Sequence, residues 1–231
     1  MINWIWSFFN LVFPSYCVVC NHKMNSLKES VCVKCLCNLP VTTYHLSKDN
    51  EIEKYFWGIF PIERATAYFY FAKGSDFQNI LYRIKYYGNQ QLARKMGRDA
   101  ANYLLSANFF DGIDLIIPVP LHKSKEKKRG YNQSEWIAKG ISEITGIEVS
   151  VNLLSRIKLT STQTRKNIWE RWENMESAFV LDDNKSLAGK HILLVDDVLT
   201  TGATICACAM AFDKIKKIKI SVFTLAIASA Y

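Results

Sequence analysis

Apolar residues along this chain follow two patterns, largely continuous runs and runs in which an apolar residue recurs every three or four positions. Continuous runs are typical of parallel strands buried on both faces, whereas the recurring pattern is typical of helices that bury one face. Strands are predicted at residues 65–71, 113–117, 192–195 and 218–228. Helices are predicted at about residues 75–88, 90–105, 130–144 and 204–216. Residues 42–54 are polar and are predicted to form a linker. Because strands and helices alternate from residue 65 onward, we expect an α/β domain with a mainly parallel sheet flanked by helices.

The first thirteen residues are apolar and aromatic, and Pro14 ends this run. Ile5, Phe8, Phe9 and Val12 share one face of a helix. The run is shorter than the roughly twenty apolar residues that cross a bilayer, and it lacks the basic start and cleavage site of a signal peptide. We therefore expect no transmembrane segment but an amphipathic helix over residues 1–14, packed on the protein's core or on a partner. Docking on a membrane surface is the alternative.

Four cysteines form two C-x-x-C pairs, Cys17 with Cys20 and Cys32 with Cys35, separated by eleven residues. Such pairs predict a tetrahedral zinc site, because each pair clamps the ion from one tight turn. We expect a small zinc-ribbon module over residues 15–45, with Zn²⁺ in a structural role, since four thiolates leave no position open. Disulfides are the competing interpretation, but no secretory signal accompanies the cysteines.

Other residues bear on this interpretation. Asn21 stands where such motifs often carry glycine, and asparagine tolerates the left-handed backbone conformation. Cys37 and His22 are close enough in sequence to be alternative ligands. Cys206 and Cys208 lie in the last predicted helix, and we expect them to be small core residues.

Two adjacent carboxylates, Asp196 and Asp197, follow the apolar run at 192–195, where we expect that strand to end. Two apolar residues later, Thr-Thr-Gly-Ala-Thr at 200–204 opens the next predicted helix. A strand, a small hydroxylated loop and a helix start are typical of phosphate sites, because unpaired amides and the positive end of the helix dipole converge there. Carboxylates accept hydrogen bonds from sugar hydroxyls. The stretch therefore favours a ribose with a 5-phosphate over solvated acids beside a threonine-rich cap.

The composition is that of an ordinary globular protein, with 49% hydrophobic and 22% charged residues among 231. A formal net charge of +8 favours polyanions, either nucleic acid or phosphorylated ligands. The basic residues are densest after the predicted strand at 113–117, where we expect a loop: Lys123, Lys125, Lys127, Lys128 and Arg129. A loop at the carboxyl end of such a strand faces the crevice where α/β sheets bind ligands, so we favour a polyanion-binding role over a merely solvated one.

The apolar run, the two acids and Thr-Thr-Gly-Ala-Thr together resemble the 5-phosphoribosyl-1-diphosphate motif of type I phosphoribosyltransferases. This resemblance implies a phosphoribosyltransferase-like fold over residues 60–231, with Mg²⁺ bound beside the diphosphate. It assigns the ribose and the catalytic centre to Asp196 and Asp197, and the diphosphate to the basic segment that contains Lys123 and Arg129. It assigns the 5-phosphate to the loop: Thr200, Thr201, Gly202, Ala203 and Thr204. Some purine-salvage members have an aspartate at the position of Thr200, and an unactivated hydroxyl is no general base near neutral pH, so purine salvage is disfavoured.

A narrower resemblance covers nearly the whole chain. Pro-Val-Pro-Leu-His at 118–122, the basic segment and Arg-Gly-Tyr-Asn-Gln at 129–133 look like the ComF family of phosphoribosyltransferase-like proteins. The remaining motifs follow in the same order: the four-cysteine ribbon, Lys-Tyr-Tyr-Gly at 85–88, Gln163, Arg171, Asn174 and Ala178-Phe179. The family is associated with DNA uptake during natural transformation.

Residues 155–176 are polar and basic, with Trp169 and Trp172 three positions apart. They are interpreted as a lid over the active site, as a helix that buries both indoles, or as a surface that stacks on bases.

Two functions are consistent with these motifs. The first is a transferase that moves the phosphoribosyl group of 5-phosphoribosyl-1-diphosphate, or a related ribose phosphate, to a nitrogen nucleophile. The second is a module that handles single-stranded DNA and partners a DNA-uptake helicase, with a regulatory or vestigial ribose-phosphate site. For both functions we expect a cytoplasmic protein.

Overall fold

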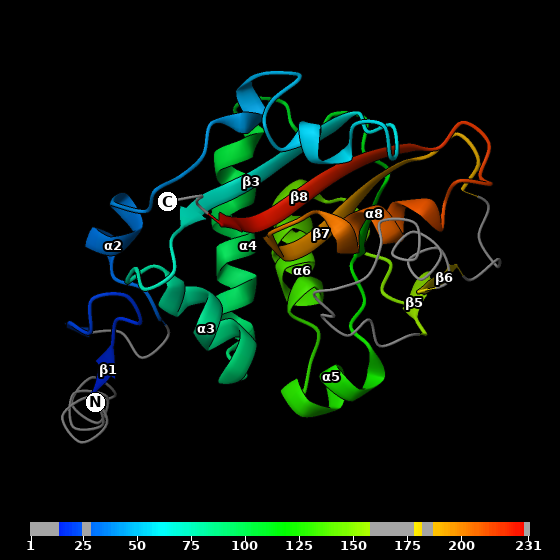
Figure 1. Ribbon diagram of the computed structural model, residues 1–231. Helices are drawn as coiled ribbons and strands as arrows, with labels where there is room; N and C mark the ends of the chain where they lie inside the picture. Colours follow the sequence, from blue (N-terminus) through cyan, green and yellow to red (C-terminus); the bar gives the residue numbers. More distant parts are fainter. Residues whose placement is uncertain (1–13, 25–28, 158–177, 182–186, 229–231) are drawn as a thin grey trace.

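The central sheet of the computed structural model contains four parallel strands in the order β3-β8-β7-β4 (Figure 1). The structure describes residues 14–24, 29–157, 178–181 and 187–228. The strands of this sheet are β3 at Arg64–Phe71, β4 at Leu115–Pro118, β7 at His191–Leu199 and β8 at Lys219–Ala228. The predicted α/β class with a mainly parallel sheet is therefore confirmed.

Burial on both faces explains why these strands are nearly continuous apolar runs. In the register of the sheet, Leu194 of β7 lies between Ile117 of β4 and Val222 of β8. All three side chains are fully buried.

Helices cover both faces of the sheet (Figure 1). One face, with Leu193 and Val195, packs against α3, α4 and α6, and the other, with Leu194, packs against α8. The bounds are α3 at Gln78–Tyr86, α4 at Gln90–Leu105, α6 at Gln133–Thr145 and α8 at Ala203–Met210. Gly97 and Gly140 let α4 and α6 approach closely, because a side chain at either position would collide with the backbone of the opposite helix. Helix α8 is shorter than predicted, since the chain turns through residues 211–217 with Lys217 in a left-handed conformation (φ 56°).

The N-terminal module consists of a two-stranded hairpin and a short helix, in line with the predicted ribbon. Its elements are β1 at Ser15–Tyr16, β2 at Lys23–Met24 and α2 at Val33–Cys37. Its apolar side chains share one core with α3 and α4, in which Cys17 and Val31 pack together with Ile84 and Leu92. The expected helix over residues 1–14 lies almost entirely outside the described residues.

Residues 42–54, whose polar composition predicts a linker, are instead packed against β3. The segment contains two 3-10 helices, η1 at Tyr44–Leu46 and η2 at Glu53–Phe56. Buried Asn50 and Glu53 explain the polar composition, since Asn50 donates to the Ala65 carbonyl and Glu53 accepts from the Ala65 amide. Polar residues here satisfy backbone groups in the interior rather than face water.

A second pair of strands, β5 at Leu154–Arg156 and β6 at Phe179–Leu181, runs antiparallel beside the core on the α8 side. The residues interpreted as a lid, Trp169 and Trp172 among them, lie between these strands and outside the described residues, as do Gln163, Arg171 and Asn174. Among the described helices, none is long and apolar enough to span a membrane.

Candidate functional site

Asp196 and Asp197 lie inside β7 rather than at its end, so the expectation that the strand stops before them is wrong. Strand β4 pairs with β7 only as far as Val195, opposite Pro118, whereas β8 continues beside β7 to Leu199. Pairing with β8 therefore keeps the two acids in strand conformation. Because β4 has already ended, one edge of β7 is open beside the carboxylates, and neighbouring side chains point to opposite faces of the sheet.

Asp196 is held by two hydrogen bonds. Its Oδ1 accepts from the Ser134 hydroxyl at 2.9 Å and from the Asp197 amide at 2.8 Å. Ser134 stands in the first turn of α6, which Asn132 caps by accepting from the Ser134 amide. Burial and the adjacent Asp197 carboxylate raise the pKa of Asp196 to about 7. This acid therefore titrates near neutral pH.

Asp197 is 9% exposed and forms an ion pair with Lys85 of α3, Nζ to Oδ1 at 3.1 Å. Tyr131 lies nearby, and burial followed by the charge of Asp197 raises the pKa of its hydroxyl to about 12. The Tyr131 hydroxyl donates to the Ile84 carbonyl, which ties α3 to the start of α6. Lys85 and Ser134 were missed as site residues, although Lys-Tyr-Tyr-Gly at 85–88 belongs to the ComF pattern.

The loop Thr200–Thr204 follows directly after β7 at the same end of the sheet. Thr200, Thr201 and Ala203 are exposed, Thr204 is partly buried, and Gly202 is buried with φ of 72°. A side chain at Gly202 would have to adopt this left-handed backbone, so a substitution there would be strained. Gly202 caps α8 without a side-chain acceptor, so the cap leaves the first amides of the helix for a ligand.

The basic segment after β4 is a helix, α5 at Lys123–Arg129, and not the predicted loop. Its ends carry strong signals, because the His122 ring accepts from the Ser124 amide and Gly130 adopts φ of 82°. The lysines of α5 are exposed, Lys123 among them at the first turn.

Arg129, at the last turn of α5, is partly buried and contacts residues of α3 and α6. Its Nη1 donates to Gln133 Oε1 at 2.7 Å, and its guanidinium lies over the Tyr86 ring of α3. Desolvation and then the charges of Arg156, Arg129 and Lys85 lower the pKa of Lys125. Cations from α3, α5 and β5 thus lie near one another, and Lys85 links this group to Asp197.

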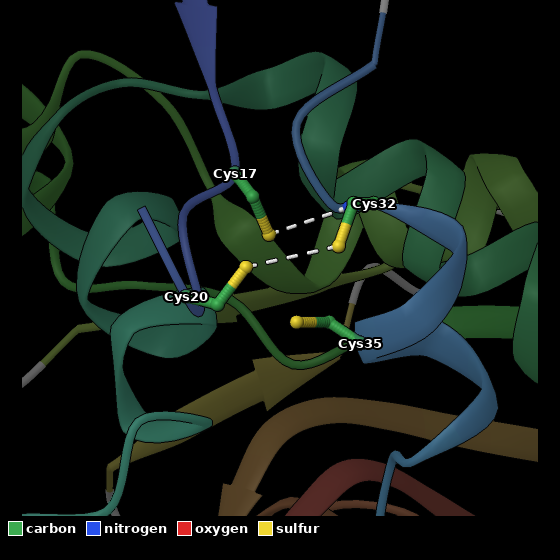
Figure 2. A group of neighbouring side chains, drawn as sticks. All are labelled: Cys17, Cys20, Cys32 and Cys35. Atoms are coloured by element: carbon green, nitrogen blue, oxygen red, sulfur yellow. Dashed lines mark hydrogen bonds between the residues drawn. The ribbon is translucent and has the colours of Figure 1, made fainter. Parts of the chain in front are cut away.

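Cys17, Cys20, Cys32 and Cys35 point toward one another from the hairpin and from the start of α2 (Figure 2). Their four sulfurs lie within 4.8 Å of one another, and those of Cys20 and Cys32 are 3.8 Å apart. Four sulfurs at about 2.3 Å from a zinc ion would be separated by about 3.8 Å, so the donor set fits tetrahedral zinc. Among the described residues all cysteines are free thiols, and neither Cys37 nor His22 joins the cluster.

The backbone around this cluster already favours thiolates. Burial opposes ionisation of Cys17, but hydrogen bonds from backbone amides of Cys20, Cys32 and Val19 prevail and lower its pKa to about 7. Asn21 adopts φ of 56° and donates its amide to the Cys17 carbonyl, as expected for a residue in the place of glycine. Cys206 and Cys208 are buried in α8 and belong to the core, as predicted.

Comparison with known proteins agrees with this geometry. The phosphoribosyl transferase domain family matches residues 90–228, more than half of the chain. The chain therefore belongs to that family, the class that its sheet and its acid–threonine stretch define. Its relatives place it more narrowly among the ComF proteins.

Competence protein F of Haemophilus influenzae is 34% identical over 114 residues, which cover 49% of this chain and 50% of that protein. DNA utilization protein YhgH of Escherichia coli K12 is 26% identical over 196 residues, 84% of this chain and 82% of that protein. Competence protein ComFC of Bacillus subtilis is 25% identical over 217 residues, 90% of this chain and 82% of that protein. With Competence protein F and the Salmonella YhgH proteins, the match spans only 50% to 58% of the relatives' length.

Among solved structures, a hypoxanthine phosphoribosyltransferase of Staphylococcus aureus is 16% identical. The match covers 60% of this chain and 64% of that chain, with a TM-score of 0.39.

Proposed function

We propose that this chain binds 5-phosphoribosyl-1-diphosphate, or a related ribose phosphate, between the open edge of β7 and the start of α8. The observation that carries the proposal is the placement of Asp196 and Asp197 beside the loop Thr200–Thr204 at one end of the sheet. In this arrangement the two carboxylates accept from ribose hydroxyls, while the loop hydroxyls and the amides at Gly202 receive the 5-phosphate.

The same site supports transfer of the phosphoribosyl group to a nitrogen nucleophile. Arg129 and the cations near it would stabilise the departing diphosphate. Lys123 lies at the opposite end of α5 from Arg129, so it would contact the diphosphate only at that end of the helix. Asp196 and Asp197 offer the oxygen ligands that Mg²⁺ prefers, and when bound with the diphosphate this ion would neutralise part of its charge. The Asp197 carboxylate is already paired with Lys85, so a ligand hydroxyl would share Asp197 with this lysine.

We further propose that Zn²⁺ occupies the four-cysteine cluster in a structural role. The support is the fit of the four sulfurs to a tetrahedral ion and the absence of a disulfide among the described cysteines. Residues 1–14, 15–45 and 60–231 remain our proposed division of the chain.

Calorimetric titration with 5-phosphoribosyl-1-diphosphate and Mg²⁺ tests the ribose site. Asp197→Asn should weaken binding roughly ten- to a hundredfold, because a lost charged hydrogen bond costs about 1.5–3 kcal/mol. Asp213→Asn is the matched control, since Asp213 is exposed beyond α8, and its affinity should equal that of the wild type. Equal affinity in Asp197→Asn and wild type, or no binding by the wild type, would remove the ribose role.

A second candidate function is the handling of single-stranded DNA. Helix α5 favours it, because four of its seven residues are exposed lysines. The names of the relatives, competence protein and DNA utilization protein, point in the same direction. In this function a DNA-uptake helicase would be the partner, in the cytoplasm.

A further inference from the structure

Three tyrosines form an exposed cluster at the end of α3: Tyr82, Tyr86 and Tyr87. Their exposed fractions are 49%, 61% and 60%. The ring of Tyr82 lies 4.9 Å from that of Tyr86 and 5.6 Å from that of Tyr87, between centroids. The tyrosine cluster is therefore a contiguous aromatic surface open to solvent rather than part of the core.

Two guanidinium groups already lie over rings of this surface. Arg83 lies 4.6 Å from the centroid of Tyr87, and Arg129 of α5 lies 5.9 Å from the centroid of Tyr86. Such cation–π pairs hold the rings in place. Arg129 donates one hydrogen bond to Gln133, and the other donors of a guanidinium group can serve an anion. Rings and cations thus form one surface built from α3 and α5.

The helix that carries the tyrosine cluster is anchored in the core. Ile80, Leu81 and Ile84 of α3 are buried in the core, and the Ile84 carbonyl accepts from the Tyr131 hydroxyl. Lys85, between Ile84 and Tyr86, pairs with Asp197. The tyrosine cluster therefore lies next to a residue of the acid site, and Arg129 joins the cluster to α5, whose lysines are exposed.

The charges around the cluster indicate what it binds. Helices α3 and α5 together carry Arg83, Lys85, the four lysines of α5 and Arg129, against the single acid Glu126. An apolar partner would gain nothing from these cations. A ligand that offers flat aromatic faces and regularly spaced negative charges satisfies both halves of the surface, and a nucleic-acid strand with unpaired bases has this chemistry.

We propose that the tyrosine cluster is a base-stacking platform for single-stranded nucleic acid, with α5 as the track for its phosphates. The platform rests on the second candidate function and gives it a residue-level site next to the proposed ribose-phosphate site. It predicts that the rings contribute binding that depends on bases and not on salt, whereas α5 contributes binding that depends on salt and not on bases.

Fluorescence anisotropy separates these contributions with two labelled probes of equal length, oligo-dT and an abasic oligomer with the same phosphates. Tyr86→Ala with Tyr87→Ala in the full chain should weaken oligo-dT binding about tenfold or more, since each stacked base contributes substantially. Binding of the abasic oligomer and the salt slope should not change. Lys125→Ala with Lys127→Ala should weaken both probes alike and reduce the slope by about 0.7 for each lost phosphate contact.

Two matched variants keep the result specific. Tyr86→Phe with Tyr87→Phe retains the rings and should bind oligo-dT like the wild type. Tyr16→Ala removes an equally exposed tyrosine, 50% exposed on β1, and should have no effect. Thermal midpoints near that of the wild type would show that the alanine variants remain folded.

The outcomes distinguish the platform from the function on which it rests. A wild type that binds neither probe fails as a DNA-handling protein, and the platform fails with it. A wild type that binds both probes equally, or an alanine variant that keeps full oligo-dT affinity, overturns the platform alone. The Tyr86→Ala with Tyr87→Ala variant could instead lose binding to anionic phospholipid vesicles and keep oligo-dT binding. That result would assign the tyrosine cluster to a lipid surface and would likewise overturn the platform.

Discussion

The cysteine cluster and the acid pair are built in opposite ways. The cluster comes from two short pairs, Cys17 with Cys20 and Cys32 with Cys35, and each pair needs only one local turn. The acid pair lies on one strand, but its partners come from two helices, Lys85 from α3 and Ser134 from α6. The first is a local site that a metal would complete, and the second is a site that the tertiary fold must assemble.

The difference teaches that spacing alone identifies the first site and only half of the second. The two sites are nevertheless joined by packing, because Cys17 and Cys35 share a core with Ile80 and Ile84 of α3. Helix α3 also carries Lys85, so the cluster supports the helix that contacts Asp197. Of three predictions, the first tests the coupling between the regions and the other two test each region by itself.

The largest effect is expected from Cys32→Ser. Metal binding in such sites supplies folding free energy, on the order of 10 kcal/mol in isolated zinc modules, so the variant should lose the ion and the order of its module. Native mass spectrometry should find one zinc per wild-type chain and none in the variant. Hydrogen exchange should rise over residues 15–24 and 29–39 and, through the shared core, in α3.

Cys37→Ser is the control for this experiment, because Cys37 is exposed and lies outside the cluster. It should keep zinc and normal exchange. Unchanged protection of α3 in Cys32→Ser would break the coupling between the regions, and a wild type with disulfides and no metal would refute the zinc site.

A smaller effect concerns pH and the acid pair alone. The pKa of Asp196 is raised from 3.8 to about 7, so between these values the folded state binds a proton that the unfolded state has released. Stability should therefore fall as pH rises from about 4 to 7, by up to about 1.4 kcal/mol per pH unit, and level off above that range.

Urea unfolding of wild type and Asp196→Asn at several pH values measures this contribution as a difference. The difference is needed because burial lowers the pKa values of His45 and His191, which contribute with the opposite sign. Parallel stability curves for the two proteins would show that Asp196 is ionised throughout and that its partners hold it as a carboxylate.

The smallest effect is expected from Asn21→Gly in the first cysteine turn. Asn21 is left-handed, with φ of 56°, and glycine enters this region without a side-chain penalty. The thermal midpoint should stay the same or rise slightly, by a stability change below about 1 kcal/mol. A marked loss of stability or of zinc would show that the asparagine side chain has a role in the turn.

Much of the fold could be predicted because buried parallel strands appear as apolar runs, and because Gln90–Leu105 repeats its apolar face regularly. The end of β7 could not be predicted, since β8 continues to pair with this strand past Asp196 and Asp197. The basic segment after β4 was expected to be a loop because basic residues are dense there. It is a helix, and His122 and Gly130 cap its two ends.

The candidate site shows the same division. Asp196, Asp197 and the loop at 200–204 are contiguous in sequence and were found. Lys85 and Ser134 were not, because their contacts with the acids exist only after α3 and α6 have packed on the sheet. Buried Asn50 and Glu53 were mistaken for linker residues, since sequence does not show that a polar group is bonded inside.

The strand order has a consequence for synthesis of the chain. Strand β8 lies between β3 and β7, although it is made long after β3. The apolar strand Arg64–Phe71 must therefore remain without its sheet neighbour until Lys219–Ala228 has emerged from the ribosome. Long-range parallel pairing of this kind is slow and leaves apolar segments exposed to aggregation, so we expect chaperones to bind the nascent protein at this stage. A ribosome that stalled before residue 219 would leave β3 separated from β7 and β4, with no continuous sheet to build on.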